Sequence, residues 1–351
     1  MPEPSPSPKR RGRLLRFGAA CVVLSAVTGY VVVQYVTGGG VKPGCRVVSA
    51  DGTGPAYEFT PEQAVNAATI TAVGTGRNMP ERAVTIALAT AIQESALRNL
   101  DHGDRDSLGL FQQRPSMGWG TAAEVTDPAY AANEFYEHLA KVRGYAELPL
   151  TVAAQRVQRS GYPEAYAKHE PDATLLAAAL TGSAAATLTC EGRAGTAVAA
   201  AGPDGVRAAL VRDFGRDALQ QAGAEVSAGD GKNTDGDGGD GDGGKDAVAA
   251  DGAGASDVPV AETSGRTVTL PVARDSTPDG RPVAARGWQL AHWAVANASA
   301  LRIESVSYAG REWVAGTSGS TWRPRDAGGA AAAEAGGAGG DTGSVRIVTA
   351  R

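Results

Sequence analysis

The sequence predicts a mainly α-helical exported domain, joined by a disordered linker to a small α+β module at the C-terminus. Helix start and stop signals follow one another between Cys45 and Cys190. Residues 227–265 consist largely of Gly and Asp with almost no large apolar residues, a composition that cannot bury a core. Patterns typical of strands and of an amphipathic helix return only in residues 266–351.

The N-terminal segment predicts a membrane anchor. A basic tail, residues 1–16, precedes an apolar run over residues 17–36, roughly the 20 residues with which a helix crosses a bilayer. The positive-inside rule places the tail in the cytoplasm and the bulk of the chain outside, as a single-pass protein of the cell membrane. A cleaved signal peptide is the alternative, but its apolar core usually spans only about 7–15 residues.

Charge and cysteine usage narrow the functional classes. The net charge of -5 gives no basic footprint for nucleic acid, and the scattered histidines form no ligand spacing, so we expect neither a metal nor a cofactor.

Cys45 and Cys190 fall on the exported side, where two thiols most simply pair. Their bond would close one folded unit over residues 45–190, with a stabilisation of roughly 4–5 kcal/mol in the chain-entropy model.

Within that unit we expect helices and no strand. Thr60 and Gln63 form a capping box around Pro61, which opens the first helix, and Pro80 precedes the second. The second helix carries apolar residues on several faces and should therefore be buried on nearly all sides. Further helices are expected to begin at Pro128, after Thr151 and at about residue 171.

The chain beyond Cys190 is predicted in three parts. Residues 191–226 are alanine-rich and contain one helix, at about 203–221, before the linker over residues 227–265. In the C-terminal module we expect a strand at 267–272, an amphipathic helix at 286–301, a strand pair at 303–313 that turns at Ala309-Gly310, and a last strand at 345–349. The module also holds tryptophans, which in so small a domain more often form a core than a sugar-binding surface: Trp288, Trp293, Trp313 and Trp322.

Glu94 is the strongest catalytic candidate. It lies near the end of the buried second helix, on one face with Ala83, Ala87 and Ala91. Burial and the negative end of the helix dipole both favour a protonated carboxyl and raise its pKa. Such a group can protonate a leaving oxygen, although a solvated glutamate in a last helical turn is the plain alternative.

Two motifs resemble a known superfamily. Glu94-Ser95, followed about fifteen residues later by Gly109-Leu110-Phe111-Gln112, is similar to the motifs of lysozyme-like lytic transglycosylases and muramidases. The resemblance covers roughly residues 47–190. The combination of one anchor, this helical domain and a tryptophan-containing C-terminal module is similar to membrane-anchored envelope proteins of actinobacteria. It implies a lysozyme-like fold, a peptidoglycan glycan strand as substrate, and Glu94 as catalytic acid and base. It also implies a set of substrate-binding residues: Ser95, Gly109, Leu110, Phe111, Gln112, Trp119, Gln155 and Tyr162.

The sequence also departs from that superfamily. An Ala-Tyr-Asn motif usual in lytic transglycosylases is missing; the nearest segments are 153–155 and 158–160, without Asn. Residues 113–116, Gln-Arg-Pro-Ser, also replace the usual residues after the glutamine. A hydrolase needs a second carboxylate, for which Asp106 is the favoured candidate beside Asp101 and Asp104, whereas a transglycosylase uses one glutamate. Aspartates in a polar loop more often form turns.

Three functional hypotheses follow. The first is an exported enzyme, a lytic transglycosylase or muramidase, that cleaves peptidoglycan glycan strands. The second is a non-catalytic wall-binding or scaffold protein that retains the lysozyme-like fold. The third places the function in the C-terminal module, which would bind the wall or an envelope protein partner.

Overall fold

The computed structural model describes residues 44–191, 202–216, 262–272, 282–316, 320–325 and 343–350. The predicted tail and anchor, residues 1–36, and the predicted linker up to residue 261 lie outside these ranges. Within them, no helix combines the length and the apolar character needed to cross a bilayer. The contacts of the chain place Pro43–Arg351 in one compact unit, which contains all of the described elements.

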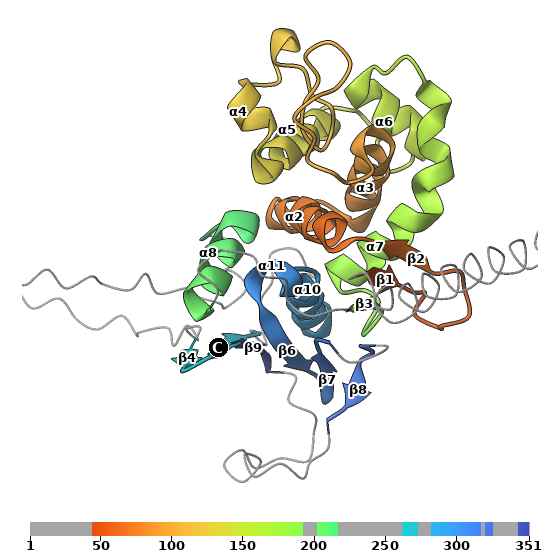
Figure 1. Ribbon diagram of the computed structural model, residues 1–351. Helices are drawn as coiled ribbons and strands as arrows, with labels where there is room; N and C mark the ends of the chain where they lie inside the picture. The colour runs from red at the N-terminus through yellow and green to blue at the C-terminus, as the bar shows by residue number, and fades with distance from the viewer. Residues whose placement is uncertain are drawn as a thin grey trace, which may run out of the picture. The chain divides into compact units, whose positions relative to one another are not determined.

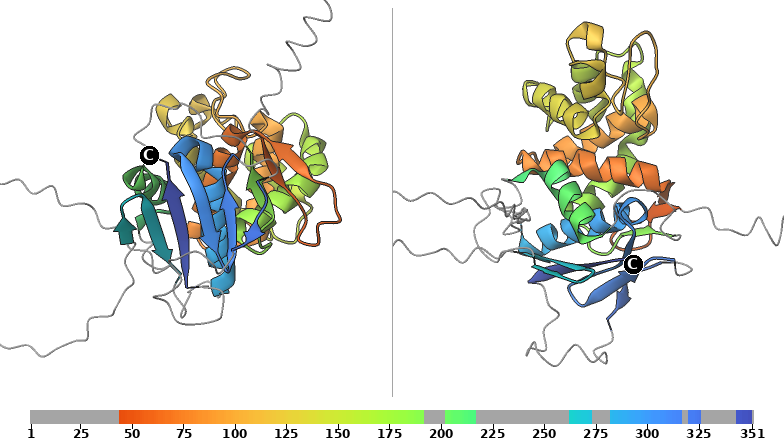
Figure 2. Two further views of the ribbon diagram at one scale, coloured as in Figure 1. Left: turned by 60° about the horizontal axis from the view of Figure 1, so that its bottom comes forward. Right: turned by 60° about the vertical axis from the view of Figure 1, so that its left-hand side comes forward.

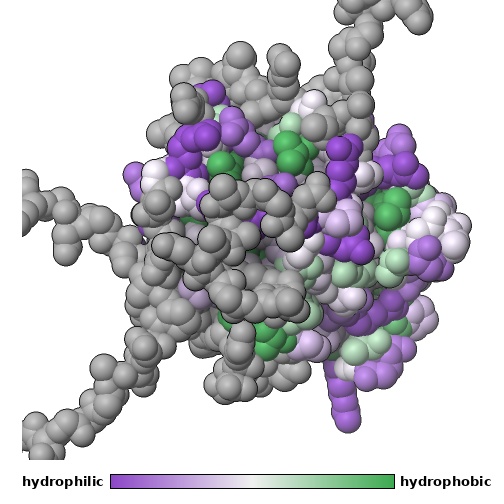
Figure 3. All heavy atoms as spheres, turned by 90° about the horizontal axis from the view of Figure 1, so that it is seen from below, coloured by the Kyte–Doolittle hydropathy of each residue, from purple (hydrophilic) through white to green (hydrophobic). Residues whose placement is uncertain are grey.

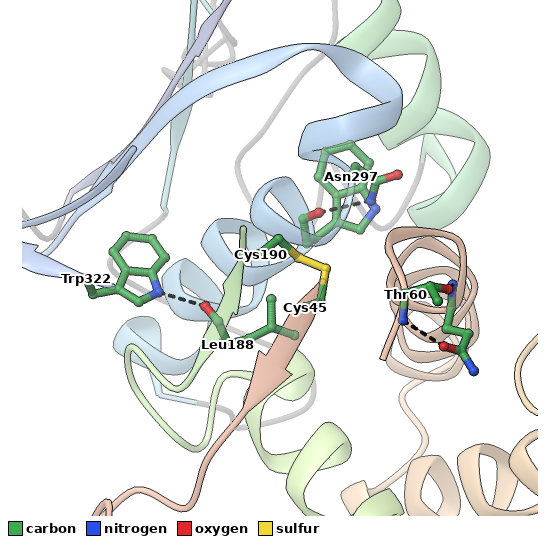
Figure 4. The surroundings of a disulfide bond; sticks show 8 residues. Cys45, Thr60, Leu188, Cys190, Asn297 and Trp322 are labelled. Atoms are coloured by element: carbon green, nitrogen blue, oxygen red, sulfur yellow. Dashed lines mark hydrogen bonds between the residues drawn. A yellow bond between two sulfur atoms is a disulfide. The ribbon is translucent and has the colours of Figure 1, made fainter. Parts of the chain in front are cut away.

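A small antiparallel sheet joins the two ends of the helical region. Its strand order is β2-β1-β3, formed by Tyr57–Phe59, Cys45–Val47 and Leu188–Cys190. Cys45 and Cys190 lie opposite each other in β1 and β3 and form the predicted disulfide, shown in Figure 4. The expectation of no strand between these cysteines is therefore wrong. Each strand has only three residues, too few for an alternating pattern to emerge from the sequence.

The helices of this region begin where the sequence signals place them. α2 (Pro61–Gly76) is opened by the complete Thr60 and Gln63 capping box, and α5 (Pro128–Ala140) is capped by Asp127. α3 (Glu81–Ser95) is buried continuously from Ala83 to Ile92, as predicted. The remaining helices are α4 (Ala122–Val125), α6 (Leu150–Gln158) and α7 (Glu170–Thr181), with short 3-10 helices η1 (Pro115–Met117) and η2 (Pro163–His169).

The C-terminal residues form an α+β arrangement, as predicted. After α8 (Pro203–Phe214), antiparallel strands assemble in the order β4-β5-β9-β6-β7-β8. Their bounds are Glu262–Ser264, Thr267–Pro271, Ser344–Thr349, Ile303–Tyr308, Arg311–Val314 and Arg323–Pro324. Val268, Ile347, Val306 and Trp313 lie in register across four of these strands and are all buried, so this face carries the core of the sheet.

α10 (Val283–Ala296) lies between this sheet and the helical region, as Figures 1 and 2 show. It packs against β6 and β9 on one side and against α7 and α2 on the other, and α11 (Ala298–Leu301) follows it. The amphipathic helix predicted from residue 286 is therefore wrong in character. Every residue from Arg286 to Ala296 is buried because α10 is covered on two opposite sides.

Polar contacts hold α10 and its neighbours to the helical region. Gln289 Nε2 donates to Thr75 Oγ1 at 2.6 Å, and His292 Nδ1 lies 2.7 Å from the carbonyl oxygen of Ala179. Trp322 Nε1 donates to the Leu188 carbonyl oxygen at 2.9 Å, beside the disulfide (Figure 4). The four C-terminal tryptophans are all at most 7% exposed, so they belong to the core, as expected.

A close backbone contact also joins the two parts. Gly182, which ends α7 with φ +83°, faces the start of α10. A Cβ there would lie 1.8 Å from the carbonyl oxygen of Ala285 and 2.7 Å from the amide nitrogen of Gln289. Only glycine combines this conformation with this approach.

Few large hydrophobic side chains of the described residues are exposed. On the face seen in Figure 3, hydrophobic residues lie among hydrophilic ones. In the described part of the chain, the large hydrophobic side chains that are clearly exposed are Met117, Tyr162 and Val314. They come from η1, the loop before η2 and β7, and thus from different regions of the fold.

The disulfide should contribute strongly to stability. Because it closes a loop with a sequence separation of 145 residues, we expect Cys45→Ser with Cys190→Ser to lower the free energy of unfolding by roughly 4–5 kcal/mol. Urea unfolding of the full-length chain measures this. Cys21→Ser is the control, and an equal loss in that variant would contradict the assignment.

His292 should make the C-terminal interface sensitive to acid. Complete burial lowers the pKa of its imidazole from 6.5 to about 4, so the folded state requires the neutral ring. Protonation of the ring below pH 6.5 favours the unfolded state. The free energy of unfolding therefore decreases, by about 3 kcal/mol at most, as the pH falls from 6.5 toward 4. We expect His292→Phe to remove this part of the pH dependence in urea titrations. An unchanged pH dependence in the variant would show that another group is responsible.

Candidate functional site

Glu94 is fixed in place by the way α3 ends. It is the penultimate residue of α3, and the two residues that follow the helix, Ala96 and Leu97, adopt left-handed conformations that turn the chain away. α2 holds this turn from the side: Gln63 Nε2 donates to the Ala96 carbonyl oxygen at 2.7 Å and Asn66 Nδ2 to that of Leu97 at 2.8 Å. The end of α3 is therefore anchored on a second helix.

The Glu94 carboxyl is half-buried and accepts a hydrogen bond from a neutral group. Tyr166 Oη donates to Glu94 Oε1 at 2.6 Å. Burial raises the pKa of Glu94, while the Tyr166 hydroxyl and the Gln158 amide oppose the rise by favouring the ionised form. The rise agrees in direction with the sequence argument from burial.

The same surroundings keep Tyr166 a hydrogen-bond donor. Tyr166 lies on η2. Burial and the neighbouring Glu94 raise the pKa of Tyr166, so the phenol stays protonated and remains a donor to the carboxyl.

The Gly-Leu-Phe-Gln loop lies directly against the end of α3. Ser95 Oγ donates to the Leu110 carbonyl oxygen at 2.7 Å, and Gln158 Nε2 donates to that of Phe111 at 2.7 Å. Gly109 has φ +75°, and a Cβ there would lie 2.1 Å from the Val125 carbonyl oxygen, so the loop requires glycine at this position. The two sequence motifs are thus brought together.

Several predicted substrate-binding residues have other partners. Leu110 and Phe111 are fully buried, and Phe111 stacks on Phe135 with ring centroids 4.7 Å apart, so these side chains are core. Gln112 Nε2 lies 3.3 Å from the carbonyl oxygens of both His102 and Gly109 and therefore closes its own loop. Ser95 is also buried.

The remaining candidates are more accessible. Trp119 is half-buried and lies against His138, with ring centroids 4.3 Å apart. Tyr162 is 80% exposed, directly before η2. Gln155 Nε2 donates to the Ser160 carbonyl oxygen at 2.7 Å and so shapes the turn that leads to Tyr166.

Asp106 is held by an arginine and a backbone amide. Its Oδ1 accepts from Arg114 Nε at 2.9 Å and its Oδ2 accepts from the Ser116 amide at 2.8 Å. These hydrogen bonds hold the pKa of Asp106 well below its usual range. Both oxygens are therefore occupied, and the carboxylate is a weak base. Arg114 and Ser116, which belong to the segment that departs from the superfamily motif, thus hold Asp106 within the loop.

The groups closest to Glu94 come from far along the chain. Tyr166 and Gln158 lie 72 and 64 residues beyond it, so no local pattern links them to the acid. Tyr166 lies within the range that the superfamily resemblance covers, and Gln158 lies within a segment that stands in place of the Ala-Tyr-Asn motif. Sequence reasoning did not assign either residue to the site.

The family model that matches this chain covers a C-terminal segment and not the region around Glu94. Residues 262–335 match the family described as VldE, C-terminal domain. This segment begins at β4 and includes α10, β6, β7 and β8, and it does not contain the residues around Glu94. A search among curated proteins gives no match to the chain.

The described residues offer no ready metal centre. Within them, no group of three or more His, Cys, Asp or Glu side chains is arranged to hold a metal ion. His102 lies 2.7 Å from Asp101, and both side chains are largely exposed to solvent. The chemistry available at Glu94 is consequently that of a carboxyl, a phenol and an amide.

Asp106 should act on the loop rather than on a substrate. We expect Asp106→Asn to lower the melting temperature, because it weakens the contacts with Arg114 and Ser116, and to leave intact the glycan cleavage that the superfamily resemblance implies. Thermal unfolding and a turbidity assay on purified peptidoglycan measure the two effects. Arg114→Ala removes the same ion pair and is the matched control. Loss of cleavage in Asp106→Asn with an unchanged melting temperature would instead assign a catalytic role.

Proposed function

We propose that this protein is an exported, membrane-anchored enzyme with a lysozyme-like domain that cleaves peptidoglycan glycan strands. The observation that carries the proposal is the half-buried Glu94 carboxyl, hydrogen-bonded by Tyr166 and placed against the Gly-Leu-Phe-Gln loop. The basic tail and the apolar run over residues 17–36 support export and anchoring, and the substrate lies on that side of the membrane.

Glu94 would act first as a general acid. A raised pKa increases the protonated fraction of the carboxyl, and the protonated group can donate its proton to the glycosidic oxygen as the bond to the anomeric carbon breaks. The hydrogen bond from Tyr166 Oη to Oε1 fixes the carboxyl orientation and leaves Oε2 free to address the substrate. Once ionised, the carboxylate is stabilised by the same phenol.

The surroundings of Glu94 favour an intramolecular second step. The groups that act on its pKa, Tyr166 and Gln158, are neutral, while Asp106 is held by Arg114 and Ser116. A hydrolase that inverts the anomeric centre needs a second carboxylate about 6.5–9.5 Å from the acid to activate water. A lytic transglycosylase needs only one: the substrate's own hydroxyl attacks the anomeric carbon and Glu94 takes its proton. We therefore infer the transglycosylase route, which consumes no water and leaves an anhydro sugar.

Exchange of the acid tests the proposal. We expect Glu94→Gln, which keeps the shape of the side chain but cannot donate the proton, to reduce clearing of purified peptidoglycan in zymograms by about 100-fold or more. Glu62→Gln, on the exposed first turn of α2, is the control with the same change of charge. Undiminished clearing by Glu94→Gln would refute the assignment.

Product mass then separates the mechanisms. Wild-type products that end in anhydro sugars support the transglycosylase route, whereas reducing ends, heavier by one water, identify a hydrolase. Glycan binding without any released product identifies the rival, a wall-binding protein that has lost turnover. The buried Leu110 and Phe111 and the engaged Gln112 amide favour this rival, because they leave fewer loop side chains for substrate.

A further inference from the structure

We propose that His169 is a positioning residue, which holds η2 against the end of α3 so that Tyr166 stays hydrogen-bonded to Glu94. His169 acts through Gln93 and the short helix rather than on a substrate. The inference rests on the proposed function for its effect on catalysis. Its structural content, a clamp between η2 and α3, can be tested without any substrate.

Two hydrogen bonds join the same two elements. Tyr166 Oη donates to Glu94 Oε1 at 2.6 Å. His169 Nε2 lies 3.0 Å from Oε1 of Gln93, the residue directly before Glu94 in the last turn of α3. Tyr166 and His169 are themselves only three residues apart in η2. The end of α3 is thus fastened to η2 at two neighbouring points.

The geometry of a 3-10 helix places both contacts on one face of η2. Such a helix has three residues per turn, so side chains three positions apart eclipse each other. Tyr166 and His169 have this spacing and therefore meet α3 from the same face. A single hydrogen bond would leave η2 free to rotate about its own axis or to slide along α3. The second contact restricts both movements and so sets where the Tyr166 hydroxyl lies.

His169 lies at the firmly held end of η2. It directly precedes α7, which packs on α3. The next residue, Glu170, accepts from Arg82 Nη1 at 2.5 Å, and Arg82 Nη2 also donates to the Leu148 carbonyl oxygen at 3.2 Å. Arg82 belongs to the first turn of α3. The clamp at His169 therefore transmits the fixed position of α7 to η2 and to Tyr166.

A neutral imidazole suits this position chemically. The Gln93 amide oxygen only accepts, so the His169 ring donates to it from a protonated Nε2. Burial and the neighbouring Lys168 lower the pKa of His169 below its ordinary 6.5, against an opposing effect of Asp172, so the ring is neutral near pH 7. The contact that fixes η2 thus adds no charge beside the Glu94 carboxyl.

Substitution of His169 in the full-length chain tests the clamp. His169→Phe keeps a ring and removes the donor, whereas His169→Gln keeps a donor nitrogen at nearly the position of Nε2. The first readout is the pKa of Glu94 from an NMR titration of its side-chain carboxyl, which needs no activity. Because the hydrogen bond from Tyr166 lowers this pKa, we expect it to rise in His169→Phe and to return toward the wild-type value in His169→Gln.

Further variants show whether His169 acts through its partner. Gln93→Met removes the acceptor, and its combination with His169→Phe should shift the Glu94 pKa no further than either single change, because both break one contact. Tyr166→Phe gives the largest rise that loss of this contact can cause. His102→Phe, at a side chain that is 78% exposed, is the control with the same exchange, and we expect no shift there. An unshifted Glu94 pKa in a folded His169→Phe would overturn the proposal.

The rate of glycan cleavage is the second readout. We expect the maximal rate to fall by roughly 10- to 100-fold in His169→Phe, because the phenol no longer holds the acid in its orientation. KM for a soluble glycan fragment should change little, because His169 and Gln93 orient the acid and do not bind the glycan. Recovery of the rate in His169→Gln supports the clamp, whereas loss of rate in both variants with an unchanged Glu94 pKa contradicts it.

One measurement keeps the test independent of variant folding. In the wild-type chain, the ring nitrogen resonances of His169 should show a proton on Nε2 that exchanges slowly with solvent. A ring protonated on Nδ1 alone, or an Nε2 proton that exchanges as fast as that of an exposed imidazole, would overturn the proposal. The outcome also remains distinct from that of the proposed function: a chain that cleaves no glycan can still carry the clamp, and an active enzyme can lack it.

Discussion

The burial of α3 is the constraint on which the rest of the structure depends. Its interior positions are dominated by small residues, among them Ala83, Ala87 and Ala91, all fully buried. Small side chains allow α2 and α7 to approach closely, and both helices pack directly on α3. The end of this tightly held helix is where Glu94 emerges. A larger residue at any of these alanines would displace the acid as well as the core, because an overpacked interior relaxes by moving its elements.

α7 links the buried α3 to the C-terminal part of the chain, because it packs on both α3 and α10. One side of it contacts α3, while α10 packs on another and meets the carbonyl oxygen of Ala179 through His292. Gly182, at the end of α7, admits the backbone of α10 at a distance that no side chain would permit. The segment that matches the VldE C-terminal domain family is therefore packed into the same hydrophobic core as the helical region.

The sequence predicted those features that depend on local chemistry. Capping residues such as Thr60 and Asp127 act within one helical turn, so the starts of α2 and α5 could be read directly. The disulfide followed from the predicted export of the two cysteines. Features that depend on residues further apart than one helical turn were not predictable in this way: the three-residue strands, the two-sided burial of α10, and the contact of Arg114 with Asp106. Tyr166 and Gln158 belong to the same class, because the fold alone brings them to Glu94.

The position of the disulfide has a mechanical consequence. Cys45 and Cys190 are the first and last strand residues of the helical region, and the covalent bond joins them directly. A tension applied between the chain before Cys45 and the chain after Cys190 passes through the sulfur atoms and bypasses the 144 residues that separate the two cysteines. The carboxyl of Glu94 and all its partners lie inside that bypassed loop. A chain stretched between a membrane and a wall would thus keep its site free of load.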